Sequence, residues 1–215
     1  MLKYYILNKY LAALSGLFLI LFLTGHLAGN LQLLIPESYG AQKQFNDYAH
    51  FMSTNPVVKV LSIVTYISII AHVLVTLALT IDSKLKRPKR YRYAASQTNS
   101  ISSKYMGVLG TVILAFIIVH LSNFWYKAKF EGETDIYNLV ISKFQHLDQV
   151  AIYVVSMLAI FFHVLHGFAS SFQSLGLVTS KTRKYFKILG MAYALLIPIM
   201  FAIIPIYIYF GFQLK

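Results

Sequence analysis

Five long apolar segments dominate the chain and alternate with short polar connections. They cover about residues 10–35, 57–81, 105–125, 150–175 and 188–212 of the 215-residue sequence. Each reaches the roughly 20 residues that a helix needs to cross the hydrocarbon of a bilayer. Since only helices and closed barrels satisfy their backbone polar groups in lipid, the pattern predicts an all-α membrane protein. We expect residues 1–215 to form one domain of five transmembrane helices.

The composition supports a membrane protein and limits its chemistry. Hydrophobic residues make up 58% of the chain and charged residues only 12%, about half the charged share of a typical soluble domain. The first apolar segment is too long for a cleaved signal peptide and should remain as a span. With no cysteine, the chain cannot form disulfides, bind an iron–sulfur cluster through thiolates or attach a c-type haem.

The net charge of +12 is distributed as a membrane topology requires, so it does not indicate nucleic-acid binding. Basic residues gather before the first span and after the second and fourth, where Asp82 is the only acid. The positive-inside rule therefore places the N-terminus in the cytoplasm and the C-terminus outside. The basic residues of that side are Lys3, Lys9, Lys84, Lys86, Arg87, Lys89, Arg90, Arg92, Lys104, Lys181, Arg183, Lys184 and Lys187. The expected interfacial aromatic residues are Trp125, Tyr126, Tyr207 and Tyr209 outside, and Tyr91 and Tyr93 inside.

Two further features concern the arrangement of helices. Phe45, Ala49 and Met52 fall on one face at helical spacing, which predicts a short amphipathic helix on the outer membrane surface. Pro198 and Pro205 predict kinks in the fifth span. That span contains no histidine, so we expect it to lie outside a four-helix core.

The other four spans each carry histidine at depth. These are His26, His72, His120 and, in the fourth span, His163 together with His166. An ionisable ring inside a membrane is costly unless it faces the protein interior, which indicates a functional site. No Asp or Glu lies within any of the five segments, which weakens a proton pump, a cation transporter or a di-iron site. Four histidines on four helices instead indicate two haems with two histidine ligands each.

Depth suggests how the histidines pair. At about 1.5 Å per residue, His26 and His120 lie in the outer half of the membrane, whereas His72 and His163 lie in the inner half. We therefore expect an outer pair His26/His120 and an inner pair His72/His163. The small residues expected to leave room for the haem rings are Gly25, Gly29, Ala71 and Gly167. The hydroxyl residues expected to bond propionates or ligand nitrogens are Ser15, Ser68 and Ser122.

Other roles for the histidines stay open at this point. A membrane histidine can simply hydrogen-bond a neighbouring helix. His166 suits a rival ligand, a propionate partner or a proton-carrying group near the inner face. His50 and His146 lie in outer loops, where solvation is the default, although His50 can also face a quinone head group together with Asn46 and Asp47.

Several short motifs accompany the candidate ligands. They are Ser15-Gly16-Leu17-Phe18, Gly25-His26-Leu27, Phe45-Asn46, Ala49-His50-Phe51-Met52, and Gly167 and Gly176 at four and thirteen residues after His163. Together with the four histidines, they resemble the dihaem cytochrome b subunit of bacterial succinate:quinone oxidoreductases, in its single-subunit, five-helix form. The resemblance covers essentially the whole chain, and its glycine spacing favours His163 over His166 as a ligand.

The resemblance implies a cytochrome b that anchors succinate dehydrogenase, or fumarate reductase, to the bacterial inner membrane. Its partners would be a flavoprotein and an iron–sulfur subunit on the cytoplasmic face, and the chain itself would hold no dicarboxylate site. Electrons from succinate would pass through an inner haem b (His72, His163) and an outer haem b (His26, His120) to a quinone, expected to be menaquinone. Some dihaem members carry an acid two positions before the fourth ligand, where this chain has Phe161. That departure puts transmembrane proton transfer by this route in question.

Two alternative functions remain. One is the cytochrome b anchor of another respiratory enzyme, such as a hydrogenase or a formate dehydrogenase. The other is a small transporter whose histidines bind protons or a metal.

Overall fold

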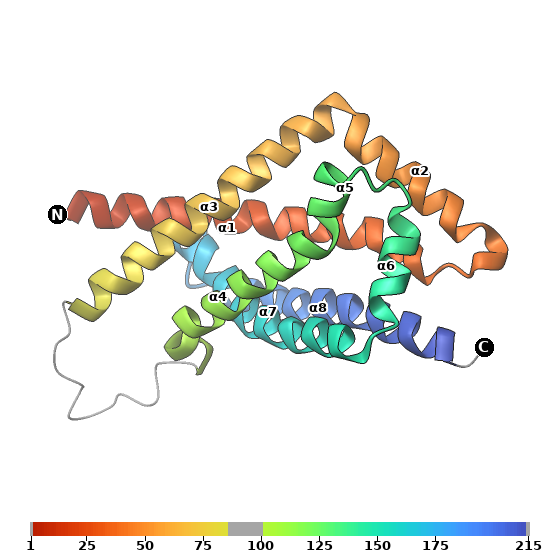
Figure 1. Cartoon of the computed structure of the whole chain (residues 1–215). Coiled ribbons are helices and arrows are strands. Elements are labelled where there is room, and N and C mark those ends of the chain that lie inside the picture. The colour runs from red at the N-terminus through yellow and green to blue at the C-terminus, as the bar shows by residue number, and fades with distance from the viewer. Residues whose placement is uncertain (1, 86–100, 214–215) are drawn as a thin grey trace.

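The computed structural model of the chain describes residues 2–85 and 101–213, whose regular elements are all helical (Figure 1). The long helices are α1 (Leu2–Asn30), α3 (Pro56–Leu85), α4 (Ile101–His120), α7 (Leu147–Ser174) and α8 (Arg183–Gln213). Shorter ones are α2 (Ala41–Thr54), α5 (Tyr126–Phe130) and α6 (Ile136–Phe144). The 3₁₀ turns η1 (Leu31–Leu34) and η2 (Glu37–Tyr39) follow α1, and the π-helical turn η3 (Leu121–Trp125) joins α4 to α5.

Five helical stretches in the described residues are long and apolar enough to cross a membrane, which confirms the predicted multi-pass, all-α class. They are Tyr4–Leu34, Pro56–Leu85, Tyr105–Phe130, Leu147–Ser174 and Arg183–Gly211. An odd number of spans places the two ends of the chain on opposite sides, and α1 starts and α8 ends at opposite ends of the molecule (Figure 1). Much of the expected inner basic and aromatic set lies outside the described residues, namely Lys86, Arg87, Lys89, Arg90, Tyr91, Arg92 and Tyr93.

Local sequence explains where several helices begin and end. Asn55 caps α3, since its side-chain oxygen accepts from the Val57 backbone N–H at 2.9 Å, and Pro56 suits the first helical position. Asp135 caps α6 in the same way, accepting from the Asn138 N–H at 3.1 Å. Helix α7 ends shortly before Gly176, which adopts φ of 76°. This left-handed conformation favours glycine after a helix.

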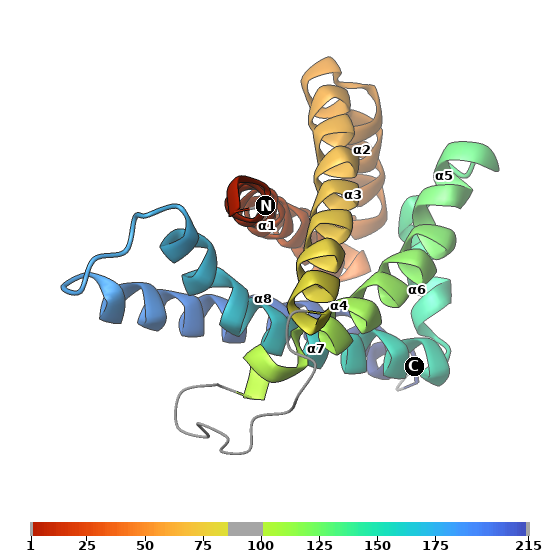
Figure 2. The same cartoon turned by 90° about the vertical axis from the view of Figure 1, so that its left-hand side faces the viewer.

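Helix α7 is the centre of the packing. It contacts α8 along its length and also contacts α4 and α1, while α1 packs in turn against α3. Helices α3 and α4 touch only slightly, near Thr80 and Gly107, and they diverge from that end (Figure 2). The four histidine-bearing helices therefore follow the packing order α3, α1, α7, α4, with α3 and α4 at the open edge.

The fifth span lies beside the four histidine-bearing helices. Helix α8 forms the most extensive helix pair in the described structure, with α7. Ala194 is completely buried in that interface, and a Cβ on Gly190 would lie 3.1 Å from Phe168. Small residues thus let α8 approach α7 closely. The helix continues through Pro198 and Pro205.

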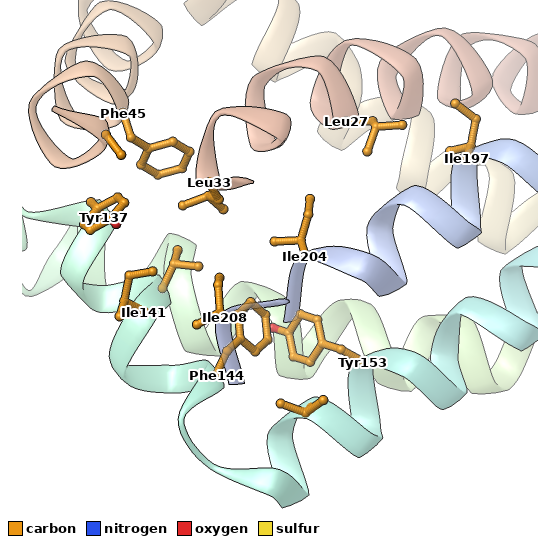
Figure 3. Close-up of a cluster of buried hydrophobic side chains, with 13 residues drawn as sticks. Leu27, Leu33, Phe45, Tyr137, Ile141, Phe144, Tyr153, Ile197, Ile204 and Ile208 are labelled. Atoms are coloured by element: carbon orange, nitrogen blue, oxygen red, sulfur yellow. The ribbon is translucent and has the colours of Figure 1, made fainter. Parts of the chain in front are cut away.

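A hydrophobic cluster closes the end of the bundle that the charge pattern predicts to lie outside (Figure 3). Phe45 of α2, Tyr137 and Phe144 of α6, and Ile204 and Ile208 of α8 are all buried there. Helix α2 is the short helix that the loop sequence predicted, and Phe45 is its buried anchor, but Met52 is 37% exposed and does not join the buried face.

Helix α6 was not anticipated from the sequence. Its buried residues recur at helical spacing after the Asp135 cap, as Tyr137, Val140, Ile141 and Phe144. This period was the available signal, but the segment is shorter than a membrane span and lies in a connection.

Outside that cluster the spans leave much of their apolar surface uncovered by protein. The accessible surface is 14489 Å², against about 10,000 Å² expected for a compact soluble protein of this mass. In the most apolar window of each span, the buried share ranges from 0% for Tyr105–Phe130 to 39% for Leu147–Ser174. Exposed Leu, Ile and Val side chains on such helices suit contact with lipid.

Candidate functional site: two histidine pairs

The outer pair consists of His26 on α1 and His120 at the end of α4. Their ring centroids lie 5.8 Å apart and the rings are nearly perpendicular, at 87°. Aromatic side chains surround both rings. Phe22 stacks on His26 at 5.4 Å and Phe201 of α8 lies 5.7 Å from it, while Phe116, Phe124 and Tyr153 lie within 6 Å of His120.

The inner pair consists of His72 on α3 and His163 on α7. Their ring centroids are 6.2 Å apart, at an interplanar angle of 72°. The His72 ring also lies against α1, since a Cβ on Gly16 would be 3.2 Å from its Cε1 atom. Glycine at this position therefore makes the space that the His72 ring occupies.

The two pairs share one geometric feature. Neither pair joins helices that pack extensively, because α1 and α4 are separated by α7, and α3 and α7 are separated by α1. Each pair thus spans a diagonal of the four helices, and its rings meet in the interior. Diagonal pairing brings side chains of facing helices together in the core of a bundle, where cofactor sites of helix bundles lie.

The two pairs lie at different levels. Tyr153, which contacts the outer pair, and His163 of the inner pair are separated by ten residues of α7. Ten residues of α-helix correspond to about 15 Å. Gly16, against the inner pair, and His26 are also ten residues apart on α1, so both helices give the same separation.

The ring separations suit two imidazoles on opposite sides of one metal ion. Metal–imidazole bonds are about 2 Å long and each ring centre lies about 1 Å behind its nitrogen, so such ligands have centroids about 6 Å apart. The observed 5.8 and 6.2 Å agree with that value. The residues present therefore fit the iron of a haem held by two histidines at each level.

Hydrogen bonds to the ring nitrogens add to this fit at the inner pair. The Ser15 hydroxyl donates to the Leu11 carbonyl at 2.7 Å, which leaves its oxygen to accept from His72 Nδ1 at 3.2 Å. A histidine that donates from Nδ1 keeps a lone pair on Nε2, as a metal ligand requires. Across the pair, His163 Nδ1 is buried and has no hydrogen-bond partner among the described residues. Such a group is unusual in a protein interior and suits a site completed by a ligand.

The outer pair has different polar neighbours. The Tyr153 hydroxyl lies 3.3 Å from His120 Nδ1. Asn30 donates to the His26 carbonyl at 2.7 Å and is 3.5 Å from its Nδ1 atom, which is too long for a strong bond. Sequence reasoning did not identify Tyr153, Asn30 or the aromatic shell. Phe116 and Phe124 carried a signal, since they lie four residues before and after His120, on the same side of the helix.

His166 lies one turn beyond His163 and is half-buried. Among the ring contacts of the described residues, the one that His72 makes with α7 is to His163. The geometry therefore places His163 opposite His72 and His166 beside the pair.

The predicted small and hydroxyl residues have mixed surroundings. No heavy atom lies within 4 Å of a Cβ built on Gly25 or Gly167, so both leave space next to a histidine-bearing segment. Gly29 serves another purpose, since a Cβ there would collide with the Tyr48 ring of α2. Ser68 is half-buried and Ser122 is exposed.

The three residues predicted to contact a quinone all lie on α2 and differ in what they contact. Asn46 is engaged, because it donates to Asp135 at 2.8 Å and accepts from the Tyr137 N–H at 2.9 Å. Asp47 is exposed and pairs with Lys43. His50 is also exposed. Asn46 therefore joins α2 to α6 and is less accessible to a ligand than Asp47 or His50.

Hydrogen bonding and burial shift the pKa values of Asp135 and Tyr137, which lie where α2 contacts α6. The pKa of Asp135 lies below its usual value because Asn46 donates to the carboxylate, as do Asn138 and Gln42. Burial, with the Glu37 carboxylate as a hydrogen-bond partner, raises the pKa of Tyr137 to about 12. Near neutral pH this contact between α2 and α6 therefore contains an ionised Asp135 and a neutral Tyr137.

No group of three or more His, Cys, Asp or Glu side chains that could hold a bare metal ion occurs in the described part of the chain. The histidines occur as pairs, which suits a haem, whose iron takes its other four ligands from the porphyrin. Comparison of the chain with protein-family models, curated proteins and solved structures finds no match.

Proposed function

We propose that the chain is a dihaem cytochrome b that anchors a succinate:quinone oxidoreductase in the bacterial inner membrane. The observation that carries this proposal is the pairing of four span histidines, two by two, across diagonals of the bundle. Their centroid separations of 5.8 and 6.2 Å agree with the value of about 6 Å expected for two imidazoles on one iron. A histidine that serves only to bond a neighbouring helix does not need a second imidazole opposite it.

The chain's own residues would hold and insulate the two haems b. His26 and His120 would bind the outer iron, and His72 and His163 the inner one. Ser15 would orient His72 by accepting its Nδ1 hydrogen, and the phenylalanines around His26 and His120 would shield the outer iron from water. When bound, the haems supply reversible one-electron chemistry, and their potentials depend on such hydrogen bonds and on burial.

The arrangement also suits a partner complex on one face and a quinone at the other. Two levels about 15 Å apart fit within the roughly 30 Å of hydrocarbon. The predicted cytoplasmic face is rich in Lys and Arg, which favours docking of a flavoprotein and an iron–sulfur protein with complementary charge. On the outer face, the exposed Asp47 and His50 are the candidates to contact a quinone head group, with menaquinone the expected species.

Isolation of the chain with its native partners from membranes tests this function. We expect a flavoprotein and an iron–sulfur protein to co-purify, and succinate to reduce the haems and then an added quinone. Isolation with a hydrogenase or formate dehydrogenase subunit, and haems that succinate does not reduce, would assign the chain to another respiratory enzyme. A purified protein without a haem absorption band would favour the transporter alternative.

A further inference from the structure

A line of hydrogen bonds connects the outer pair to the surface of the protein. Gln149 donates to the exposed Asp148 carboxylate at 2.9 Å, and its own carbonyl oxygen accepts from Asn123 at 3.2 Å. Asn123 also donates to the Tyr153 hydroxyl at 3.3 Å. That hydroxyl lies 3.3 Å from His120 Nδ1. Four side chains from η3 and α7 therefore form a hydrogen-bonded line that runs from the surface to His120 Nδ1.

The direction of donation along this line follows from its outer end. An ionised carboxylate only accepts hydrogen bonds, so Gln149 must direct its amide N–H toward Asp148 and its carbonyl toward Asn123. Asn123 then presents both amide hydrogens, one to Gln149 and one to Tyr153. Asn123 therefore holds the Tyr153 oxygen in place, and that oxygen keeps a second lone pair that can accept from His120 Nδ1.

The local backbone and burial favour a specific role for this line. Asn123 lies in the π-helical turn η3, which begins directly after His120, and such turns occur frequently at functional sites. Tyr153 is buried, with 6% of its surface exposed, and its hydroxyl contacts Asn123 and His120. At the other histidine of the pair, His26, the Nδ1 contact found among the described residues is with Asn30 and is long, at 3.5 Å.

We propose that Tyr153 is a positioning residue for the outer haem, whose hydroxyl oxygen accepts the Nδ1 hydrogen of His120 and so lowers the reduction potential of that haem. The inference rests on the proposed function. A ligand that donates its second N–H becomes more basic and stabilises ferric iron over ferrous iron. The line through Asn123, Gln149 and Asp148 keeps the tyrosine oxygen at the position that this bond needs.

Tyr153→Phe tests the inference, because it removes one oxygen and keeps the ring. Redox titration of both haems is carried out on the full chain in membranes, and the outer haem is taken as the component that is lost in His120→Ala. We expect Tyr153→Phe to retain both haems, to raise the midpoint potential of the outer haem and to leave the inner haem unchanged. An unchanged outer potential, or equal shifts of both haems, would overturn the inference.

Tyr193→Phe is the matched control. It removes the same atom from a span tyrosine whose hydroxyl contacts Ile20 and Thr24 of α1, so neither potential should change. An outer-haem shift as large as that of Tyr153→Phe would count against a specific role.

Asn123→Leu provides a second test that does not depend on recovery of the first variant. It removes the donor that holds the Tyr153 oxygen in place, so the bond from His120 weakens and the outer potential should rise, as in Tyr153→Phe. A fall or no change contradicts the inference. Wild-type protein without haem would refute the proposed function itself, whereas haem-bearing protein with unshifted variants would refute only the role of Tyr153.

Discussion

Ring nitrogens and their neighbours distinguish the span histidines from one another. His72 and His120 each have a hydroxyl oxygen near Nδ1, at 3.2 and 3.3 Å, whereas His163 Nδ1 has no partner in the described residues. Each candidate haem would thus have one histidine oriented by a hydrogen bond and one held mainly by packing. Depth along the spans was enough to predict which rings face each other, because helical rise is regular. The partners of the ring nitrogens depend on side-chain directions between helices, and depth does not provide them.

The choice between His163 and His166 can be tested one residue at a time. We expect His163→Leu to lower the haem content from about two to about one per chain, because His72 loses the imidazole that faces it at 6.2 Å. His166→Leu, one turn away on the same helix, is the matched control and should retain both haems. Extracted haem measured against protein decides between them. Loss of haem only in His166→Leu would reverse the ligand assignment.

The individual elements show where the sequence was sufficient and where it was not. Uninterrupted apolar runs predicted all five spans, and the Phe45 period predicted α2. The close packing of α8 on α7 was not predicted, because it depends on Ala194 and Gly190, which look unremarkable in an apolar run. Helix α6 was missed because its four buried residues are covered only after α2 and α8 fold over them.

The contact between α2 and α6 depends on Asp135. Asp135→Ala removes the α6 cap and the bonds from Gln42 and Asn46, so we expect it to lower the free energy of unfolding by about 1–2 kcal/mol at pH 7. Asp47→Ala on α2 is the control, since its pair with Lys43 is 65% and 83% exposed and should contribute less than about 1 kcal/mol. Thermal unfolding in detergent measures both. Equal effects of the two substitutions would contradict the role of Asp135.

Because Asp135 stabilises the contact in its ionised form, its contribution to the free energy of unfolding should depend on pH. Its pKa is lowered in the folded state from the usual value of 3.8, so its stabilisation is fully present above that value and is lost as pH falls through the folded-state pKa. The difference in stability between wild type and Asp135→Ala should therefore shrink below about pH 4. A difference that is the same at pH 7 and at low pH would show that ionised Asp135 does not stabilise the contact.

At the scale of the whole molecule, the charge distribution and the histidine levels together define a direction. Thirteen of the 19 Lys and Arg residues lie on the predicted cytoplasmic side, nearer the inner pair. A reporter at Lys215 should therefore read as external and one inserted near Lys89 as cytoplasmic. Both sites lie outside the described residues. The opposite readings would place His26 and His120, instead of His72 and His163, next to the partner subunits.

The most direct measurement of the central claim is the haem content of the purified chain. Four histidines in two facing pairs, and no cysteine for covalent attachment, predict about two extractable b haems per chain. The ratio should fall when either member of a pair is replaced, with His26→Leu and His120→Leu removing the same spectral component and His72→Leu removing the other. Protein that folds in membranes without haem, or that retains both components when His26 and His72 are replaced together, would contradict the assignment of these pairs as haem ligands.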